Sequence, residues 1–179
     1  VFGKHTDYAG GRSLVTAVPR GITMSASPAG DGRVVIRDLP TGAQAEIPTH
    51  GDGPSSGWWR YPHTVVRRLA ANFPAADLSA TLAFSSDLPQ AAGISSSTAL
   101  IVAIAESLIA CARLEDTAEW RDAIRTTEDR ASYFGCIENG ATYGPFEGST
   151  GVGTHGGSED HAAIVMSRAG ELRQFSYMP

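Results

Sequence analysis

Residues 87–100 read DLPQAAGISSSTAL, a run in which glycine and small hydroxylated residues stand directly before an apolar segment. The segment 99–105 contains no charged side chain, which predicts a helix buried on nearly all sides. The first N–H groups of a helix have no partner within it, and the peptide dipoles place partial positive charge there. Residues 87–100 therefore predict an anion site, suited to phosphate, at the start of a core helix.

The side chains of this run suit a phosphate and a metal ion. Gly93 lets the backbone approach a ligand closely, and the hydroxyl groups of residues 95–98 can donate to phosphate oxygens or bind a cation. A second interpretation stays open, in which one serine merely caps a core helix.

The composition is that of a globular domain. With 179 residues, of which 42% are hydrophobic and 18% charged, the chain predicts one domain or a large piece of a longer protein. A net charge of −5 with scattered Lys and Arg residues argues against nucleic acid as a partner. The longest apolar run, residues 99–112, is too short for a bilayer, so no membrane partner is expected. Cys111 and Cys136 lack CxxC spacing, which predicts reduced thiols in a cytoplasmic protein.

The hydrophobic pattern predicts strands first and then interleaved helices, an order that favours an α+β fold with two layers. Breaks at Gly and Pro separate the expected elements. Beside the helix after residue 95, these are strands over 11–27, 33–39 and 78–84, a surface loop over 42–57, helices over 61–73 and 120–134, and a closing hairpin of 162–167 and 172–177.

A second cluster lies in residues 3–11, GKHTDYAGG, where a histidine, a carboxylate and a phenol stand within four residues. Such side chains could bracket a polyhydroxylated ligand, and the glycine pair can turn the chain sharply. A solvated turn that caps a strand uses the same residue types, so this alternative stays open.

A third cluster lies in residues 151–161, GVGTHGGSEDH. Its glycines match GxGxxG, but no strand is expected before them and a strand is expected after them, so a dinucleotide site is not predicted. Asp160 stands before an apolar segment, where a carboxylate is costly unless it is paired or used. A structural turn aspartate remains the alternative.

Glu128 falls one turn after Ile124, at the edge of the expected 120–134 helix, where an acid is suited to a cation. The alternative is a surface glutamate paired with Arg121, Arg125 or Arg130.

Together these segments resemble the GHMP small-molecule kinases and, among them, the galactokinases. Residues 3–11 are similar to the galactokinase hallmark with its His-Thr-Asp-Tyr core, and residues 88–97 to the family's phosphate loop. Trp59 and Tyr61 before Val65 and Val66 are similar to a family helix, and residues 157–160 to the segment that carries its catalytic aspartate.

This resemblance implies an ATP- and Mg²⁺-dependent kinase that phosphorylates a sugar, at its anomeric hydroxyl. It also implies a two-layer α/β sandwich with a mostly antiparallel sheet. Asp160 would take the proton from the attacking hydroxyl or orient it, and Ser97 with Glu128 would bind Mg²⁺. The ATP phosphates would bind Pro89, Gly93, Ile94, Ser95, Ser96 and Ser97, and the sugar would bind Lys4, His5, Asp7, Gly157 and Asp160.

The sequence departs from the family in three places. Lys4 stands where galactokinases carry an acid, so it either pairs with a nearby carboxylate or meets an acidic group on a sugar other than galactose. Residues 136–156 are longer and richer in glycine than usual, which suggests an extra lid or rim. The family's upstream arginine and C-terminal glycine-rich motif are absent, so we expect the N-terminal domain of a longer kinase, with a C-terminal domain as its partner.

Two other classes of function stay open. A sugar- and ATP-binding sensor derived from a galactokinase would keep these sites without turnover. A serine hydrolase could combine residues 95–97 with His155 or His161, although no GxSxG motif exposes a nucleophile.

Overall fold

The main sheet of the computed structural model, which describes residues 7–53, 56–89, 95–153 and 157–177, has four strands. The order across the sheet is β2 (Ile22–Pro28), β5 (Ala80–Ser86), β3 (Arg33–Asp38) and β4 (Gln44–Pro48). The pairs β2–β5 and β3–β4 are antiparallel, whereas β3–β5 is parallel. The predicted mostly antiparallel sheet is therefore confirmed.

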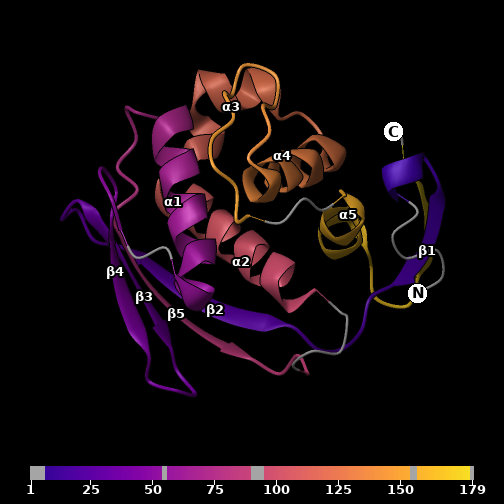
Figure 1. The fold of residues 1–179 in the computed structure, drawn as a ribbon, viewed down its shortest axis with the longest axis horizontal. Helices are drawn as coiled ribbons and strands as arrows, with labels where there is room; N and C mark the ends of the chain where they lie inside the picture. Colours follow the sequence, from indigo (N-terminus) through magenta and orange to yellow (C-terminus); the bar gives the residue numbers. More distant parts are fainter. Residues whose placement is uncertain (1–6, 54–55, 90–94, 154–156, 178–179) are drawn as a thin grey trace.

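One face of this sheet carries the core, because its strands alternate buried and exposed side chains with a period of two. Val34 and Ile36 of β3 and Leu82 of β5 are completely buried. Helices α1 (Arg60–Asn72) and α2 (Ser96–Cys111) cover that face (Figure 1). Sheet and helices form the two layers of the predicted α+β fold.

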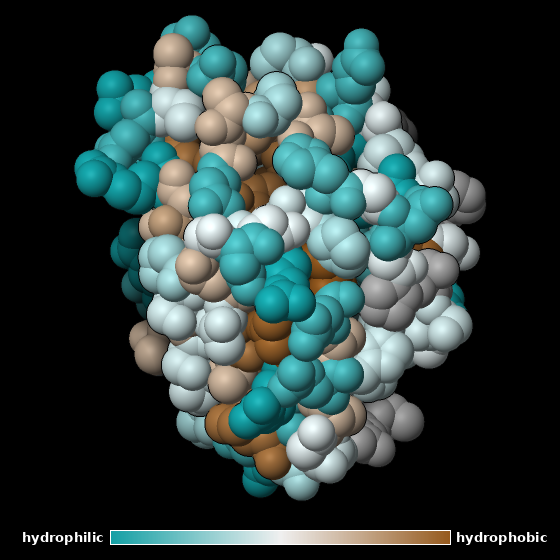
Figure 2. All heavy atoms as spheres, turned by 90° about the vertical axis from the view of Figure 1, so that its left-hand side faces the viewer, coloured by the Kyte–Doolittle hydropathy of each residue, from teal (hydrophilic) through white to brown (hydrophobic). Residues whose placement is uncertain are grey.

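The opposite side of the molecule meets solvent. Figure 2 looks at the side that carries β3 and β4 in Figure 1, and its surface is mostly hydrophilic or neutral with scattered hydrophobic spots. None of the helices in the described ranges is long and apolar enough to cross a membrane.

Three further helices and a small sheet complete the fold. Helices α3 (Ala118–Ala123) and α4 (Thr127–Asn139) lie beyond α1 and α2, and α5 (Glu159–Met166) lies between them and the small sheet (Figure 1). That sheet pairs β1 (Arg12–Thr16) with β6 (Leu172–Ser176), in antiparallel register. Three short 3₁₀ helices are η1 (Asp7–Ala9), η2 (Gly57–Trp59) and η3 (Leu114–Asp116).

Two sequence predictions about the elements are corrected. Residues 42–57 are not all loop, because Ala45 and Ile47 alternate toward the core and form β4. The expected 120–134 helix is two helices, because Thr126 begins α4 with a capping box. Its hydroxyl accepts from the Asp129 N–H, and the Asp129 carboxylate accepts from the Thr126 N–H.

The expected closing hairpin is wrong. Residues 159–166 form α5, and β6 pairs with β1, so that Arg12 stands opposite Ser176. A short apolar run does not by itself distinguish a strand from a buried helix. Glu159 and Asp160 in the first turn fit the positive end of the helix dipole. The GxGxxG-like residues are thus followed by a helix, and in the described residues directly before them, 147–150, no strand is present.

Candidate functional site

The start of α2 has the backbone geometry of a strained functional loop. Ser95 precedes the helix with φ 53° and ψ 52°, a left-handed conformation that L-residues other than Asn and Asp adopt rarely. Its side chain makes no capping hydrogen bond to the helix. Ser96 and Ser97 open the first turn, and Pro89 is exposed ahead of it. The predicted Gly93 and Ile94 lie outside the described residues.

A groove connects this helix start to α5. Its volume is about 460 Å³, and it lies between α2, α5 and the connection from β1 to β2. Ser95 lines it from the α2 side, and Glu159 and Asp160 line it from α5. The structure therefore brings together the predicted phosphate segment and the predicted catalytic aspartate. The apolar part of the lining includes Val15, Val18, Ile22, Val102 and Ile164.

Asp7 joins the same end of α5. Its carboxylate is buried, and Oδ2 accepts a hydrogen bond of 3.1 Å from the Glu159 N–H. A Cβ atom at Gly157 would overlap Asp7 Oδ2, so any larger residue here would displace the Asp7 carboxylate. Asp7, Gly157 and Asp160, three of the predicted sugar-binding residues, are thus placed close together. The other two, Lys4 and His5, lie outside the described residues.

Tyr177 adds a hydroxyl group that the sequence analysis missed. Its OH is 2.7 Å from Ser13 Oγ, across the β1–β6 sheet. Burial raises the pKa of Tyr177, the Ser13 hydrogen bond lowers it, and the charges of Glu159, Asp7 and Asp160 raise it. The phenol therefore stays neutral beside three carboxylates, in a surrounding that offers both donors and acceptors to a polar ligand.

A fourth carboxylate, which was not among the predicted site residues, lies next to the start of α2. Glu138 lies near the C-terminal end of α4 with its side chain only 12% exposed. Its Oε2 accepts a 3.0 Å hydrogen bond from the Thr98 hydroxyl and lies 2.9 Å from His161 Nε2. Since Thr98 follows Ser97, Glu138 stands where the sequence analysis had placed Glu128.

The predicted pairing of Ser97 with Glu128 stays a prediction, and the fold sets Glu128 apart from the start of α2. Helix α4 runs antiparallel to α2: Arg130 pairs with Glu106 at one end, and Glu138 pairs with Thr98 at the other. Glu128 and Glu138 are ten residues apart in this helix, which corresponds to about 15 Å along its axis. Glu128 is exposed and faces a hollow shared with Met166 and Glu171.

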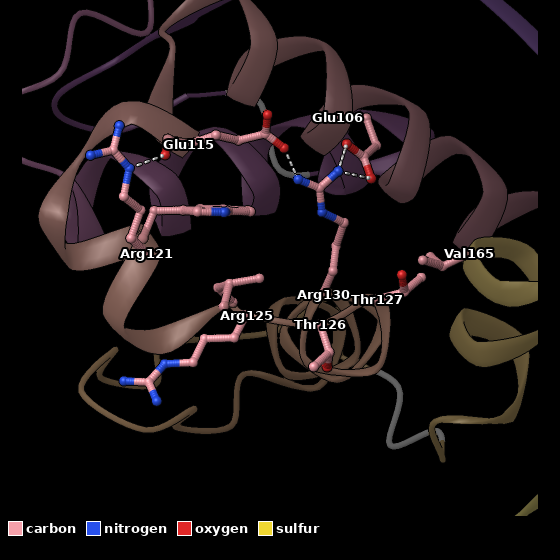
Figure 3. A pocket seen from close by; sticks show the side chains of 10 residues that line it. Glu106, Glu115, Arg121, Arg125, Thr126, Thr127, Arg130 and Val165 are labelled. Carbon is pink, nitrogen blue, oxygen red and sulfur yellow. Dashed lines mark hydrogen bonds and ion pairs between the residues drawn. The ribbon is translucent and has the colours of Figure 1, made fainter.

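The arginines proposed as surface partners of Glu128 bind other groups. Arg130 points between Glu106 and Glu115 and pairs with both (Figure 3), and its guanidinium lies 5.3 Å from the centre of the Trp120 ring. Burial raises the pKa of Glu106, and Arg130 opposes that shift. Arg121 pairs with Asp116. A second hollow, which is shown in Figure 3 and which Glu106, Glu115 and Arg130 help to line, is held by these internal ion pairs.

The glycine-rich stretch after α4 packs on that helix. The Val152 N–H donates to the Glu138 carbonyl at 2.9 Å, and Ser149 N–H to Gly140 O at 3.0 Å. A Cβ atom at Gly140, Gly148 or Gly151 would overlap the neighbouring backbone. None of the described residues of 136–156 lines the groove, and the described part of this stretch packs on the end of α4. The expected lid or rim stays a prediction.

The donors at the start of α2 fit a magnesium ion that nucleotide phosphates complete. Mg²⁺ is usually held by one or two carboxylates and hydroxyls together with substrate phosphates and water. Glu138 supplies a carboxylate beside Thr98, the residue after Ser97, and no group of three or more His, Cys, Asp or Glu that could hold a metal alone occurs in the described part of the chain. Within the described residues, both ring nitrogens of buried His161 lack an aligned hydrogen bond. The cluster of Thr98, Glu138 and His161 therefore does not satisfy all of its own polar atoms.

Comparisons with known proteins show what this chain resembles. The family model for the N-terminal domain of GHMP kinases matches residues 60–135. A curated galactokinase of Actinobacillus pleuropneumoniae (serotype 5b) is 29% identical over 109 residues, which are 60% of this chain and 28% of that protein. The chain thus spans less than a third of the length of such relatives. These matches confirm the predicted resemblance.

Solved structures show the same fold. A galactokinase of Lactococcus lactis, solved with galactose, superimposes with a TM-score of 0.73 at 18% identity, covering 97% of this chain and 41% of that one. The mevalonate kinase of Methanococcus jannaschii gives a TM-score of 0.67 at 11% identity, covering 98% of this chain and 50% of that one.

Proposed function

Residues 60–135 carry a GHMP kinase N-terminal domain, and from this premise we propose that the chain is the ATP- and sugar-binding domain of a longer, galactokinase-like kinase. The reaction is transfer of the γ-phosphate of ATP to a sugar hydroxyl, the anomeric one. The observation that carries this proposal is the groove that joins Ser95, at the start of α2, to Asp160 of α5. The C-terminal domain closes the site from the other side.

The phosphate side of the site is the N-terminus of α2. Its backbone N–H groups and dipole favour phosphate, and the Ser95 side chain does not occupy them. Residues 95–97 bind the ATP phosphates together with Pro89, Gly93 and Ile94. Ser97 and Glu138, the latter in place of Glu128, hold Mg²⁺. Mg·ATP supplies the phosphoryl group and neutralises charge as that group is transferred.

The acceptor side is the cluster around Asp7. Lys4, His5, Asp7 and Gly157 hold the sugar, and Asp160 accepts the proton of the attacking hydroxyl or orients it. Phosphoryl transfer depends mainly on in-line positioning and on charge stabilisation, so a single well-placed carboxylate suffices on this side. The buried position of Asp7 and its bond to the Glu159 N–H fix the acceptor cluster to α5.

Lys4 decides which sugar is accepted. Asp7, Glu159 and Asp160 give this end of the groove a negative charge that a lysine can neutralise. If Lys4 pairs with one of them, the sugar is neutral; if it meets the ligand, the sugar carries an acidic group.

The protein works in the cytoplasm, in line with Cys111 and Cys136, which are both free thiols.

The test is a panel of sugars with Mg·ATP and the complete protein, followed by ADP release. The panel contains galactose, its amino and acidic derivatives, and other hexoses. Turnover of one of these sugars is the expected result. ATP binding without turnover on any sugar would instead favour the sensor, and labelling of residues 95–97 by a fluorophosphonate would favour the hydrolase.

A further inference from the structure

His161 is a buried side chain that the proposed reaction does not use. It follows Asp160 in the first turn of α5, and the residue is 2% exposed. Its ring packs against Gly135 of α4, where a Cβ atom would lie 3.5 Å from Nδ1. Its Nε2 lies 2.9 Å from Glu138 Oε2. His161 therefore links α5, which carries Asp160, to Glu138 of α4, whose carboxylate contacts the first turn of α2.

The position of the Glu138 carboxylate is energetically unfavourable unless donors or a cation compensate its charge. Glu138 stands in the last turn of α4, where the negative end of the helix dipole disfavours a carboxylate. It is also largely buried, and a buried carboxylate needs donors or a cation. Thr98 and His161 both approach the same oxygen, Oε2, and neither contact uses Oε1.

The side chains of His161 and Glu138 are close, but no aligned hydrogen bond joins them. Although Nε2 and Oε2 are 2.9 Å apart, the N–H direction is not aligned for a hydrogen bond, so both ring nitrogens lack one within the described residues. Buried polar groups are seldom left in this state, and a small turn of the carboxylate is enough to align the pair.

We propose that His161 is a positioning residue for magnesium: its imidazole holds Oε2 of Glu138, so that the carboxylate presents its other oxygen to the cation. This inference rests on the proposed function, because it takes Glu138 as a ligand of Mg²⁺. Groups that orient a ligand from behind typically contribute about 10- to 100-fold to metal affinity.

The test measures how much Mg²⁺ improves binding of a non-hydrolysable ATP analogue to the complete protein, by calorimetry with and without the metal. His161→Met removes the donor at similar volume, whereas His161→Gln keeps an N–H near the place of Nε2. We expect the methionine variant to lose about 10-fold or more of the magnesium-dependent gain and the glutamine variant to stay within about 3-fold of wild type. Metal-free binding of the analogue stays unchanged in both.

Two controls separate positioning from packing. His63→Met changes a histidine of α1 whose Nε2 accepts from the Gly53 N–H at 3.2 Å, and it leaves the gain unchanged. If His161 acts through Glu138, the double variant His161→Met, Glu138→Gln loses no more of the magnesium-dependent gain in binding than Glu138→Gln alone. Additive losses would overturn the inference.

Other outcomes also decide the question. A full magnesium gain in His161→Met, or an equal loss in His161→Gln, would show that the ring only packs and would overturn the inference. A wild-type protein with a magnesium gain but no sugar turnover refutes the proposed kinase while leaving the His161 comparison intact. A wild type without any gain refutes Glu138 as a metal ligand and this inference with it.

Discussion

At the scale of single residues, the proposed metal site depends on which of two glutamates lies near the start of α2. Both belong to α4, but only Glu138 reaches Thr98 at the start of α2, and Glu128 stays on the surface. Helical geometry fixes this outcome, because ten residues along α4 carry a side chain about 15 Å away.

Glu138→Gln and Glu128→Gln form a matched pair of substitutions. The first removes a buried carboxylate charge at the α2 terminus, so the Mg²⁺ concentration for half-maximal activity rises about 10-fold or more. The second removes an exposed charge and leaves that concentration unchanged. Magnesium titrations of sugar phosphorylation in the complete protein measure both. An effect of Glu128→Gln as large as that of Glu138→Gln would return the metal site to the original prediction.

The predicted site residues that the structure brings to the groove or beside it share one property: each belongs to a short local pattern. Ser95 and Asp160 stand next to an apolar segment, and Asp7 lies in a polar cluster before a glycine pair. Glu138 and Tyr177 were missed because their partners are 40 and 164 residues away in sequence, at Thr98 and Ser13. The one local signal for Glu138 was an acid near the C-terminal end of a helix, opposed to the dipole.

At the scale of elements, the end of α4 depends on a buried arginine in α1. Arg68 is completely buried, and its Nη2 donates to the carbonyls of Ala141 at 2.7 Å and Phe146 at 3.3 Å. Its Nε donates to Asn72 Oδ1 at 2.7 Å. The glycine-rich stretch is thereby attached to α1, while its other end binds the Glu138 carbonyl through Val152.

Arg68→Met is expected to reduce the free energy of unfolding by about 3 kcal/mol, because it leaves two buried loop carbonyls without their charged donor. Arg67→Met is the matched control. Arg67 is the next residue of α1, and it pairs with the fully exposed Asp52, so its loss costs about 0.5 kcal/mol or less. Urea denaturation measures both. Equal stabilities of the two variants would mean that Arg68 does not hold the loop.

The capping box of α4 gives a pH-dependent prediction. The Tyr143 hydroxyl, the Arg125 N–H and the groups of Thr126 hold the pKa of Asp129 below its ordinary 3.8. A lowered folded-state pKa stabilises the protein above the unfolded value, and this contribution is lost as the pH falls through the folded value. Asp129→Asn should therefore lower the melting temperature by about 2–4 °C at pH 7, for a cap of about 1 kcal/mol.

The same substitution should have a smaller effect at pH 3 than at pH 7, because the contribution of the carboxylate declines once the pH falls below the ordinary pKa of 3.8. Asp122→Asn, on the exposed surface of α3, controls for the loss of a charge. A difference in melting temperature between Asp129→Asn and wild type that is the same at both pH values would contradict the role of the carboxylate.

Elements with a long period-3.6 or period-2 pattern were predicted, and short ones were not. Helices α1 and α2 and strands β3 and β5 lie close to their expected positions. Strand β4 was hidden by the Gly, Pro and Ser residues around it, and α5 was taken for a strand because eight residues with an apolar run fit both. The pairing of β1 with β6 joins opposite ends of the chain, which no local pattern encodes.

At the scale of the whole molecule, the fold places two distant segments of the chain on one groove. The start of α2 contributes hydroxyl groups and backbone N–H groups that the Ser95 side chain does not cap, and α5 with η1 contributes carboxylates. This division matches what phosphoryl transfer requires, an anion-binding wall opposite a group that holds the acceptor hydroxyl. The two-layer architecture was predictable from element order, but the groove itself depended on α5 being a helix.

The most direct test of this account is the comparison of Asp160→Asn with wild type in the complete protein, on the best sugar of the panel. If Asp160 acts on the acceptor hydroxyl, kcat falls by about 10³-fold or more, while the dissociation constant for Mg·ATP stays the same. Near-normal turnover by the asparagine variant would contradict the account, because the groove would then not be the place where phosphate is transferred.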